Sequence, residues 1–190
     1  MPKHFKISVL GDGGWGTALA LVSARKGHET LLWSAFPEYA KELDQKRDNY
    51  KFLPGVPIPK NITITSRLDQ AVQFGEILVL AVPAQFLRNI LFKLKDYDLS
   101  KKIVLSVAKG IEVKTLARPS EIIQSVLGKV NLAVLSGPSH AAEVARNIPT
   151  LVVVASQDKK VAETVQEALR DLRFRIYVQT DVVGVEVGGA

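Results

Sequence analysis

Short apolar runs alternate with longer amphipathic stretches along most of the chain. Several of the runs are apolar without strict alternation, which is typical of strands that are covered on both faces. We expect strands at residues 6–10, 29–33, 62–66, 76–83, 102–108, 131–136, 150–156 and 174–180. We expect helices between them, at residues 15–26, 37–47, 67–73, 84–95, 115–127, 139–146 and 158–170. Strand–helix–strand alternation predicts an α/β fold with a doubly wound, mostly parallel sheet and helices on both of its faces.

Two segments stand outside this alternation. The Pro-rich stretch LPGVPIP at residues 53–59 indicates a loop. After Thr180 the sequence gives only DVVGVEVGGA, and we expect this small-residue tail to have no partner element within the chain.

The composition fits a globular chain in a reducing compartment. The 190 residues are 47% hydrophobic, which is enough to build a core and excludes a disordered chain. The absence of cysteine excludes disulfides, a thiolate metal site and a cysteine nucleophile, and it suits the cytoplasm. No apolar run approaches the roughly 18 residues that span a bilayer. We also find no signal peptide, and we expect a cytoplasmic protein without a membrane partner.

The formal net charge of +6 suits anionic metabolites as well as nucleic acid. The densest basic stretch, residues 41–51, is interrupted by Glu42, Asp44 and Asp48, as on a solvated helix face. Because the chain shows neither a basic stripe nor a helix-turn-helix signal, we expect no nucleic-acid partner.

A glycine-rich turn follows the first apolar run and opens a helical stretch. The segment Gly11-Asp12-Gly13-Gly14-Trp15-Gly16 matches G-x-G-x-x-G between a strand and a helix, the setting in which this motif is informative. Gly11 permits the tight turn, Gly13 lets the backbone approach a pyrophosphate, and Gly16 lets helix and strand pack closely. The positive end of the helix dipole then faces the phosphates. The motif predicts a Rossmann-type dinucleotide site; a plain turn between strand and helix is the alternative.

The residues after the second run leave the choice of cofactor open. An NAD site usually places an Asp or Glu about 20 residues beyond the glycines, where it binds the ribose hydroxyls. Here Trp33 is followed by Ser34, Ala35 and Phe36, which include neither an acid nor an Arg for a 2′-phosphate. Ser34 can hydrogen-bond either group, and Phe36 either lies against the adenine or packs within its turn. We therefore expect NAD or NADP.

Three later runs end in residues that suit a ligand at the carboxyl edge of the sheet. Pro83 puts backbone where a nicotinamide ring would lie, or simply ends its strand. Lys109 either binds a phosphate or polarises a carbonyl, or it is one more surface lysine. The turn from Ser136 to Ser139 opens a helix; Ser139 either caps that helix or holds substrate or cofactor. His140 has no acid or nucleophile paired with it in sequence, and we interpret it as a bystander.

Four segments stand in one order along the chain: GDGGWGTALA at residues 11–20, NYKFLPG at 49–55, VAKGIE at 107–112 and SGPSHAAEVA at 136–145. With EVGGA at 186–190 they resemble the N-terminal domain of bacterial NAD(P)-dependent glycerol-3-phosphate dehydrogenases, from about residue 6 to the C-terminus. The resemblance implies reversible reduction of dihydroxyacetone phosphate to sn-glycerol 3-phosphate by NADH or NADPH, for phospholipid synthesis.

The resemblance also implies roles for particular residues. Ala35 stands where the family often has Arg or His, which weakens any claim of a strong NADPH preference. Lys109 is the candidate catalytic residue of this chain, and no metal is expected. The implied contacts are Gly14 and Trp15 with the cofactor phosphates, Lys109 with substrate and cofactor, Gly137 and Ser139 with substrate, and Ala141 with the cofactor near its nicotinamide end.

In the family, EVGGA leads within one or two residues into a Lys that donates and accepts the proton and begins an all-helical second domain. We therefore expect residues 1–180 to form the NAD(P)-binding domain and residues 181–190 to begin a helical domain that is absent here. Such a chain should bind dinucleotide but turn over little or not at all, and full-length members are expected to be homodimers. We also expect exposed side chains at Val182, Val183, Val185 and Val187.

Two alternatives stay open. Another two-domain hydroxy-acid dehydrogenase, such as a 6-phosphogluconate or hydroxyacyl-CoA enzyme, shares the glycine loop. A non-catalytic dinucleotide-binding module would show the same loop without a reaction. The joint presence of KGIE, GPSHAAEVA and NYKFLPG favours the glycerol-3-phosphate enzyme.

Overall fold

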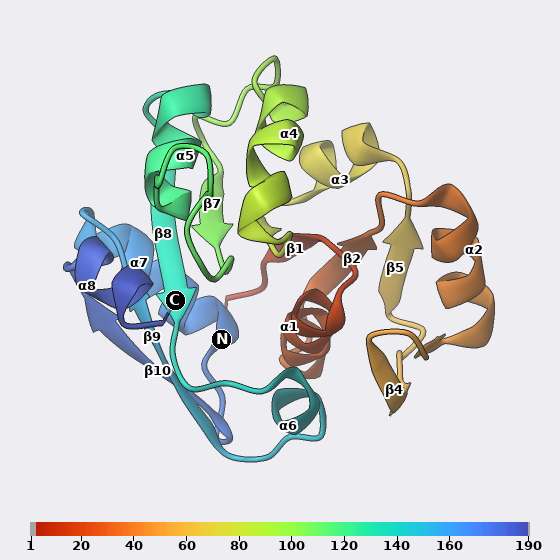
Figure 1. Ribbon diagram of the computed structural model, residues 1–190. Helices are drawn as coiled ribbons and strands as arrows, with labels where there is room; N and C mark the ends of the chain where they lie inside the picture. Colours follow the sequence, from red (N-terminus) through yellow and green to blue (C-terminus); the bar gives the residue numbers. More distant parts are fainter. Residues whose placement is uncertain (1–2, 190) are drawn as a thin grey trace.

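A mostly parallel sheet organises the molecule. The computed structural model describes residues 3–189; residues 1–2 and 190, which the expected domain bounds include, lie outside this part. Within it, an eight-stranded sheet has the order β10-β9-β8-β7-β6-β1-β2-β5 (Figure 1). The expected runs form these strands: β1 (Lys6–Leu10), β2 (Glu29–Trp33), β5 (Ile62–Thr65), β6 (Ile77–Leu80), β7 (Ile103–Ser106), β8 (Asn131–Ser136), β9 (Thr150–Ala155) and β10 (Phe174–Gln179).

The order of the strands creates a crevice. The chain runs outward from β1 through β2 to β5, and it then returns to β6 on the other side of β1 and continues to β7 and β8. All of these pairs are parallel, whereas β9 runs antiparallel to β8 and carries β10 parallel to itself. The doubly wound, mostly parallel sheet is thus confirmed. In such sheets ligands bind at the carboxyl ends of the strands where the order reverses, here between β1 and β6.

Helices cover both faces because both faces of the central strands are apolar. Successive strand residues point to opposite sides, so Val9 joins one buried cluster and Leu10 the other. The cluster around Val9 includes side chains of α1 (Gly14–Arg25), α2 (Pro37–Lys46), α6 (Ala141–Ala145) and α7 (Lys159–Leu169). The cluster around Leu10 includes side chains of α3 (Leu68–Phe74), α4 (Ala84–Leu94) and α5 (Pro119–Leu127). None of the described helices combines the length and apolarity that a bilayer crossing needs.

The loop expected at residues 53–59 is wrong in part. Residues Leu53–Pro57 form β4, which pairs antiparallel with the short β3 (Asp48–Asn49). The side chains of Leu53, Val56 and Ile58 are buried in the core beneath the first helices. This burial outweighs the tendency of Pro and Gly to form a loop. A two-stranded ribbon at the edge of the fold also tolerates Pro where no ladder hydrogen bond is needed.

Two helices begin later than expected. The helix predicted from residue 115 starts at Pro119, since a residue before Pro is pushed to extended backbone and Arg118 has ψ 156°. The helix predicted from residue 139 starts at Ala141, with His140 as its N-cap. Ser139 is therefore not the cap: its hydroxyl donates a hydrogen bond to the Gly137 carbonyl oxygen over 3.2 Å.

The tail after Thr180 does have partner elements, contrary to expectation. It forms α8 (Val182–Val187), which packs against β8 and β9. The Glu186 carboxylate accepts hydrogen bonds from the Ser120 backbone N–H (2.8 Å) and from Arg118 (2.6 Å). Of the four valines expected on the surface, Val183 and Val187 are exposed, and Val182 and Val185 are half-buried because they face the strands.

Candidate functional site

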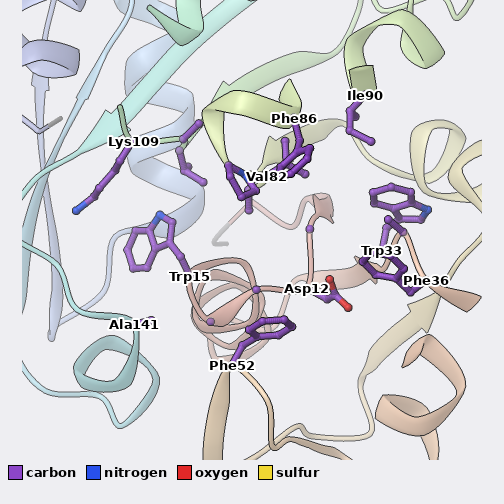
Figure 2. Close-up of a pocket in the computed structure, with 18 of the residues that line it drawn as sticks. Asp12, Trp15, Trp33, Phe36, Phe52, Val82, Phe86, Ile90, Lys109 and Ala141 are labelled. Atoms are coloured by element: carbon purple, nitrogen blue, oxygen red, sulfur yellow. The ribbon is translucent and has the colours of Figure 1, made fainter. Parts of the chain in front are cut away.

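A cavity of about 750 Å³ opens at the carboxyl ends of β1, β2, β6 and β7, beside the reversal in strand order. Its lining comes from residues at or after the ends of these strands and of β8, together with α1, α4, α6 and Phe52. In Figure 2 Lys109, Trp15 and Ala141 lie on one side of the cavity, and Trp33, Phe36 and Ile90 lie on the other. The cavity is thus a trough with two chemically different ends.

The glycine loop forms the floor between these ends. Gly11 has a φ of +125°, and a Cβ there would lie 2.5 Å from the Ala81 carbonyl oxygen. At Gly16 a Cβ would collide with the Gly11 carbonyl oxygen, so α1 and β1 pack as closely as the motif predicts. A Cβ at Gly13 would meet nothing within 4 Å. Gly13 is also the N-cap of α1 and makes no side-chain cap, which leaves the first N–H groups of this helix for a ligand.

Asn49 fixes the loop from behind. Its amide nitrogen donates hydrogen bonds to the Asp12 carbonyl oxygen and to the Thr17 hydroxyl, each over 2.7 Å. The Tyr39 hydroxyl in turn donates to the Asn49 amide oxygen over 2.6 Å, and burial raises the pKa of Tyr39 to about 12. This role of Asn49 escaped sequence analysis, although the residue opens the NYKFLPG segment that carries the resemblance.

The Asp12 side chain is buried at the cavity. Asp12 as a whole is only 8% exposed, and its carboxylate oxygen Oδ2 has no hydrogen-bond partner among the described residues. Burial raises the pKa of Asp12; the Ser34 hydroxyl and the charge of Lys51 lower it, but by less. Sequence analysis assigned Asp12 no role, because the second position of the motif accepts any residue.

Exposed phenyl rings line the trough from its middle to one end: in Figure 2 Phe52 and Phe86 lie near the middle, and Phe36 lies at the end that it shares with Trp33. Phe36, Phe52 and Phe86 are 67%, 55% and 61% exposed, although phenyl rings are normally buried. Ala35 and Trp33 complete this end. Exposed rings that line one cavity are typical of a site for a flat, apolar ligand group such as a base.

The other end gathers the residues expected to contact substrate. The Lys109 ammonium donates a hydrogen bond to the Gly137 carbonyl oxygen over 3.2 Å, the same oxygen that the Ser139 hydroxyl contacts. Lys109, Ser139 and Ala141 line the cavity beside Trp15, whereas Gly137 lies behind them. The ends of β7 and β8 thereby bring an ammonium and a hydroxyl to one place.

Helix α4 holds the loop that carries Lys109. The Gln85 amide donates to the Ile111 carbonyl oxygen (2.7 Å) and accepts from the Val113 N–H (3.0 Å). Arg88 forms a two-pronged ion pair with the Glu112 carboxylate at 2.9 and 2.8 Å. This guanidinium is the main cause that lowers the pKa of Glu112 to about 2.

The expected site residues divide into two groups. Lining the cavity are Gly11, Gly13, Gly14 and Trp15 of the glycine loop, Ala35 and Phe36 after β2, Pro83 after β6, and Lys109, Ser139 and Ala141. Three of the expected residues do not line the cavity: Gly16, Ser34 and Gly137. The buried Ser34 hydroxyl closes its own turn, where it accepts from the Phe36 N–H over 3.2 Å. In residues 3–189 no group of three His, Cys, Asp or Glu side chains is placed to hold a metal ion.

Comparison with known proteins points in one direction. Residues 6–162 match the family model described as NAD-dependent glycerol-3-phosphate dehydrogenase N-terminus. A glycerol-3-phosphate dehydrogenase [NAD(P)+] of Chlorobium phaeobacteroides (strain BS1) is 49% identical over 188 residues, which are 97% of this chain and 56% of that protein. One of Thermoanaerobacter sp. (strain X514) is 49% identical over 185 residues, again 97% of this chain and 56% of that protein. The chain thus spans a little over half the length of these relatives.

Solved structures agree. The crystal structure of glycerol-3-phosphate dehydrogenase from Coxiella burnetii is 34% identical, with a TM-score of 0.92, over 98% of this chain and 57% of that one. The enzyme from Saccharomyces cerevisiae is 29% identical, with a TM-score of 0.87, over 99% of this chain and 60% of that one. A GDP-mannose dehydrogenase at 17% identity and a TM-score of 0.72, over 96% of this chain and 47% of that one, shares the fold alone.

Proposed function

Because the chain belongs to the NAD-dependent glycerol-3-phosphate dehydrogenase family, whose N-terminal part it matches, we propose that its cavity binds NAD or NADP and presents the nicotinamide to dihydroxyacetone phosphate. The observation that carries this proposal is the trough itself, which joins exposed aromatic rings, a helix N-terminus and the Lys109 group in one cavity. Its shape and its donors fit a dinucleotide: a base at one end, a pyrophosphate over Gly13 and a second ring at the other end.

Each part of the lining has a task in binding. The end with Phe36 and Trp33 takes the adenine, since the Phe36 ring offers apolar surface that folding leaves uncovered. The first N–H groups of α1 take the pyrophosphate. Ala141 lies with Lys109 on the side at which the nicotinamide would lie, and Pro83 lines the same cavity.

The reaction needs a hydride and a proton. When bound, the reduced nicotinamide supplies the hydride to the carbonyl carbon of the ketone, and the oxygen takes a proton to give the alcohol. The Lys109 ammonium donates a hydrogen bond to the Gly137 carbonyl oxygen. In this proposal it also polarises the ketone oxygen of the substrate. The Ser139 hydroxyl lies beside Lys109, and its own hydrogen bond to the Gly137 carbonyl oxygen orients this hydroxyl. These residues position the two reactants, which is the main contribution a protein makes to hydride transfer.

Binding is tested by fluorescence. Both tryptophans of the chain, Trp15 and Trp33, line the cavity, one at each end. Bound NADH should therefore quench their emission and gain emission itself by energy transfer. A saturable curve in the micromolar range supports the proposal. No change up to about millimolar NADH, the weak end of useful affinities, would overturn it.

Turnover is tested separately. Among the described residues that line the cavity, only Lys109 carries an ammonium, and a general acid in the right place is worth about 10²–10⁴-fold. We infer that the 190-residue chain alone oxidises NADH with dihydroxyacetone phosphate at under about 1% of the rate of a full-length relative. A rate near that of the relative would contradict this inference.

A further inference from the structure

The structure leaves one buried carboxylate unexplained at the adenine side of the trough. Asp12 lines the cavity, and its Oδ2 is buried without a hydrogen-bond partner in the described part of the chain. A buried carboxylate oxygen without a donor is costly, and native proteins usually give such an atom a partner. In Figure 2 Asp12 lies between the two ends of the cavity, with its carboxylate on the side of Phe36.

The backbone of Asp12 is held in place. Its carbonyl oxygen accepts hydrogen bonds from the Asn49 amide (2.7 Å) and from the Thr17 hydroxyl (3.3 Å). Both donors are buried, so the backbone that carries the carboxylate is held beside the cavity. Ser34, the first residue after β2, is close enough for its hydroxyl to lower the pKa of Asp12. The carboxylate therefore sits beside the end of β2, the place from which an acid usually reaches the ribose.

The residues that follow β2 offer no side chain that could bind the ribose hydroxyls. Ser34 uses its hydroxyl to close a turn with the Phe36 backbone, and Ala35 and Phe36 carry no polar side-chain atoms. Resting on the proposed function, we propose that Asp12 supplies from the glycine loop the carboxylate that reads the adenosine ribose. Its free oxygen accepts hydrogen bonds from the 2′ and 3′ hydroxyls, which makes this site select NAD over NADP.

The charges around the site agree with this selection. A 2′-phosphate would bring about two negative charges next to the carboxylate, and like charges at such a distance repel strongly. Among the described residues that line the cavity, the only basic side chain is that of Lys109, at the other end. The charge of Lys51 lowers the pKa of Asp12, but its ammonium lies over the Tyr39 ring at 4.2 Å, and Lys51 does not line the cavity.

The test compares affinities for NADH and NADPH in the 190-residue chain and in two variants. Asp12→Asn removes the charge and keeps the shape. Asp48→Asn is the matched control, because Asp48 also has a buried oxygen without a partner but does not line the cavity. The original chain should bind NADH about tenfold more tightly than NADPH, as expected for one charged hydrogen-bonding group. Asp12→Asn should bring the two affinities within about threefold, and Asp48→Asn should leave their ratio unchanged.

Other outcomes separate the two proposals. If the original chain binds neither cofactor, the proposed function fails. If it binds both and Asp12→Asn leaves the ratio unchanged, or if it prefers NADPH, the role of Asp12 is wrong and the proposed function stands. Thermal unfolding checks that each variant folds. Asp12→Ser serves if Asp12→Asn does not fold, with the same expected loss of preference. Adenosine 5′-monophosphate and adenosine 2′,5′-bisphosphate should repeat the pattern, since only the adenosine half is involved.

Discussion

Gly13 and Gly16 lie on the same turn, yet a side chain added at each would meet opposite surroundings. At Gly13 the added Cβ faces the open cavity, and the backbone φ of −61° suits any residue. At Gly16 the added Cβ would strike the Gly11 carbonyl oxygen and approach the Ala81 side chain. One glycine therefore serves the ligand, and the other serves the packing of helix on strand.

This contrast gives a matched pair of variants. Gly13→Val should fold and keep its thermal midpoint, but it should lose at least about tenfold in NADH affinity, because the new methyl groups occupy the phosphate position. Gly16→Val should lose about 3 kcal/mol or more of unfolding free energy, since backbone atoms cannot move aside as side chains do. Urea unfolding and NADH titration measure both. Unchanged NADH binding by a folded Gly13→Val would show that the phosphates lie elsewhere.

Single residues show what a sequence motif reveals and what it does not. The three spaced glycines predicted the turn because each answers to a local geometric need. Asn49 could not be found in this way, since its partners Asp12 and Thr17 lie 37 and 32 residues away and meet it only after folding. Asp12 could not be singled out either, because its role is inferred from a buried carboxylate oxygen without a partner, which only the folded structure shows.

At the scale of elements, strands were predicted better than the segments that brace them. A buried strand is recognised from its own residues, but β4 is a strand only because the core covers Leu53 and Val56. In the same way, α8 is held because the Glu186 carboxylate accepts hydrogen bonds from Ser120 and Arg118. The attachment of the Lys109 loop to α4 through Arg88 and Glu112 likewise joins residues 24 positions apart.

The Arg88–Glu112 pair should make stability depend on acidity. The pKa of Glu112 falls from its ordinary 4.5 to about 2 in the folded chain, so the pair stabilises the fold fully above pH 4.5 and is lost as the pH falls toward 2. Glu112→Gln should flatten this part of the curve of unfolding free energy against pH. Glu163→Gln, at an exposed ion pair of 3.6 Å with Lys159, should leave it unchanged. An equal slope in Glu112→Gln and the original chain would refute the assignment.

Helix α8 should depend chiefly on Glu186, the one buried side chain of this helix. Removing this carboxylate leaves the buried Ser120 N–H and hydroxyl without their acceptor and takes from Arg118 one of its two carboxylate partners, which costs about 1–3 kcal/mol. In Glu186→Ala, amide hydrogen exchange of residues 182–189 should speed up by about tenfold or more, while the strands keep their protection. Val183→Ala, at a side chain 51% exposed, is the control and should exchange as the original chain does. Equal exchange in both variants would show that other contacts hold α8.

At the scale of the whole molecule, the order of the strands decides where chemistry can occur. Parallel strands bring their carboxyl ends to one edge, and the reversal between β1 and β6 opens the trough there. Alternation of strands and helices was enough to predict this edge. The antiparallel β9 was not expected in particular, because the direction of a strand depends on how the connection before it travels, which apolar periodicity does not record.

The central claim is that the backbone amides at the start of α1 hold the pyrophosphate of a dinucleotide. Amide chemical shifts in a two-dimensional ¹⁵N NMR titration with NADH test this residue by residue. The largest shifts should fall on Gly13, Gly14 and Trp15. The signals of Gly128 and Lys129, which line a separate cavity of about 550 Å³, should not move. Shifts concentrated at that second cavity, or none at saturating NADH, would contradict it.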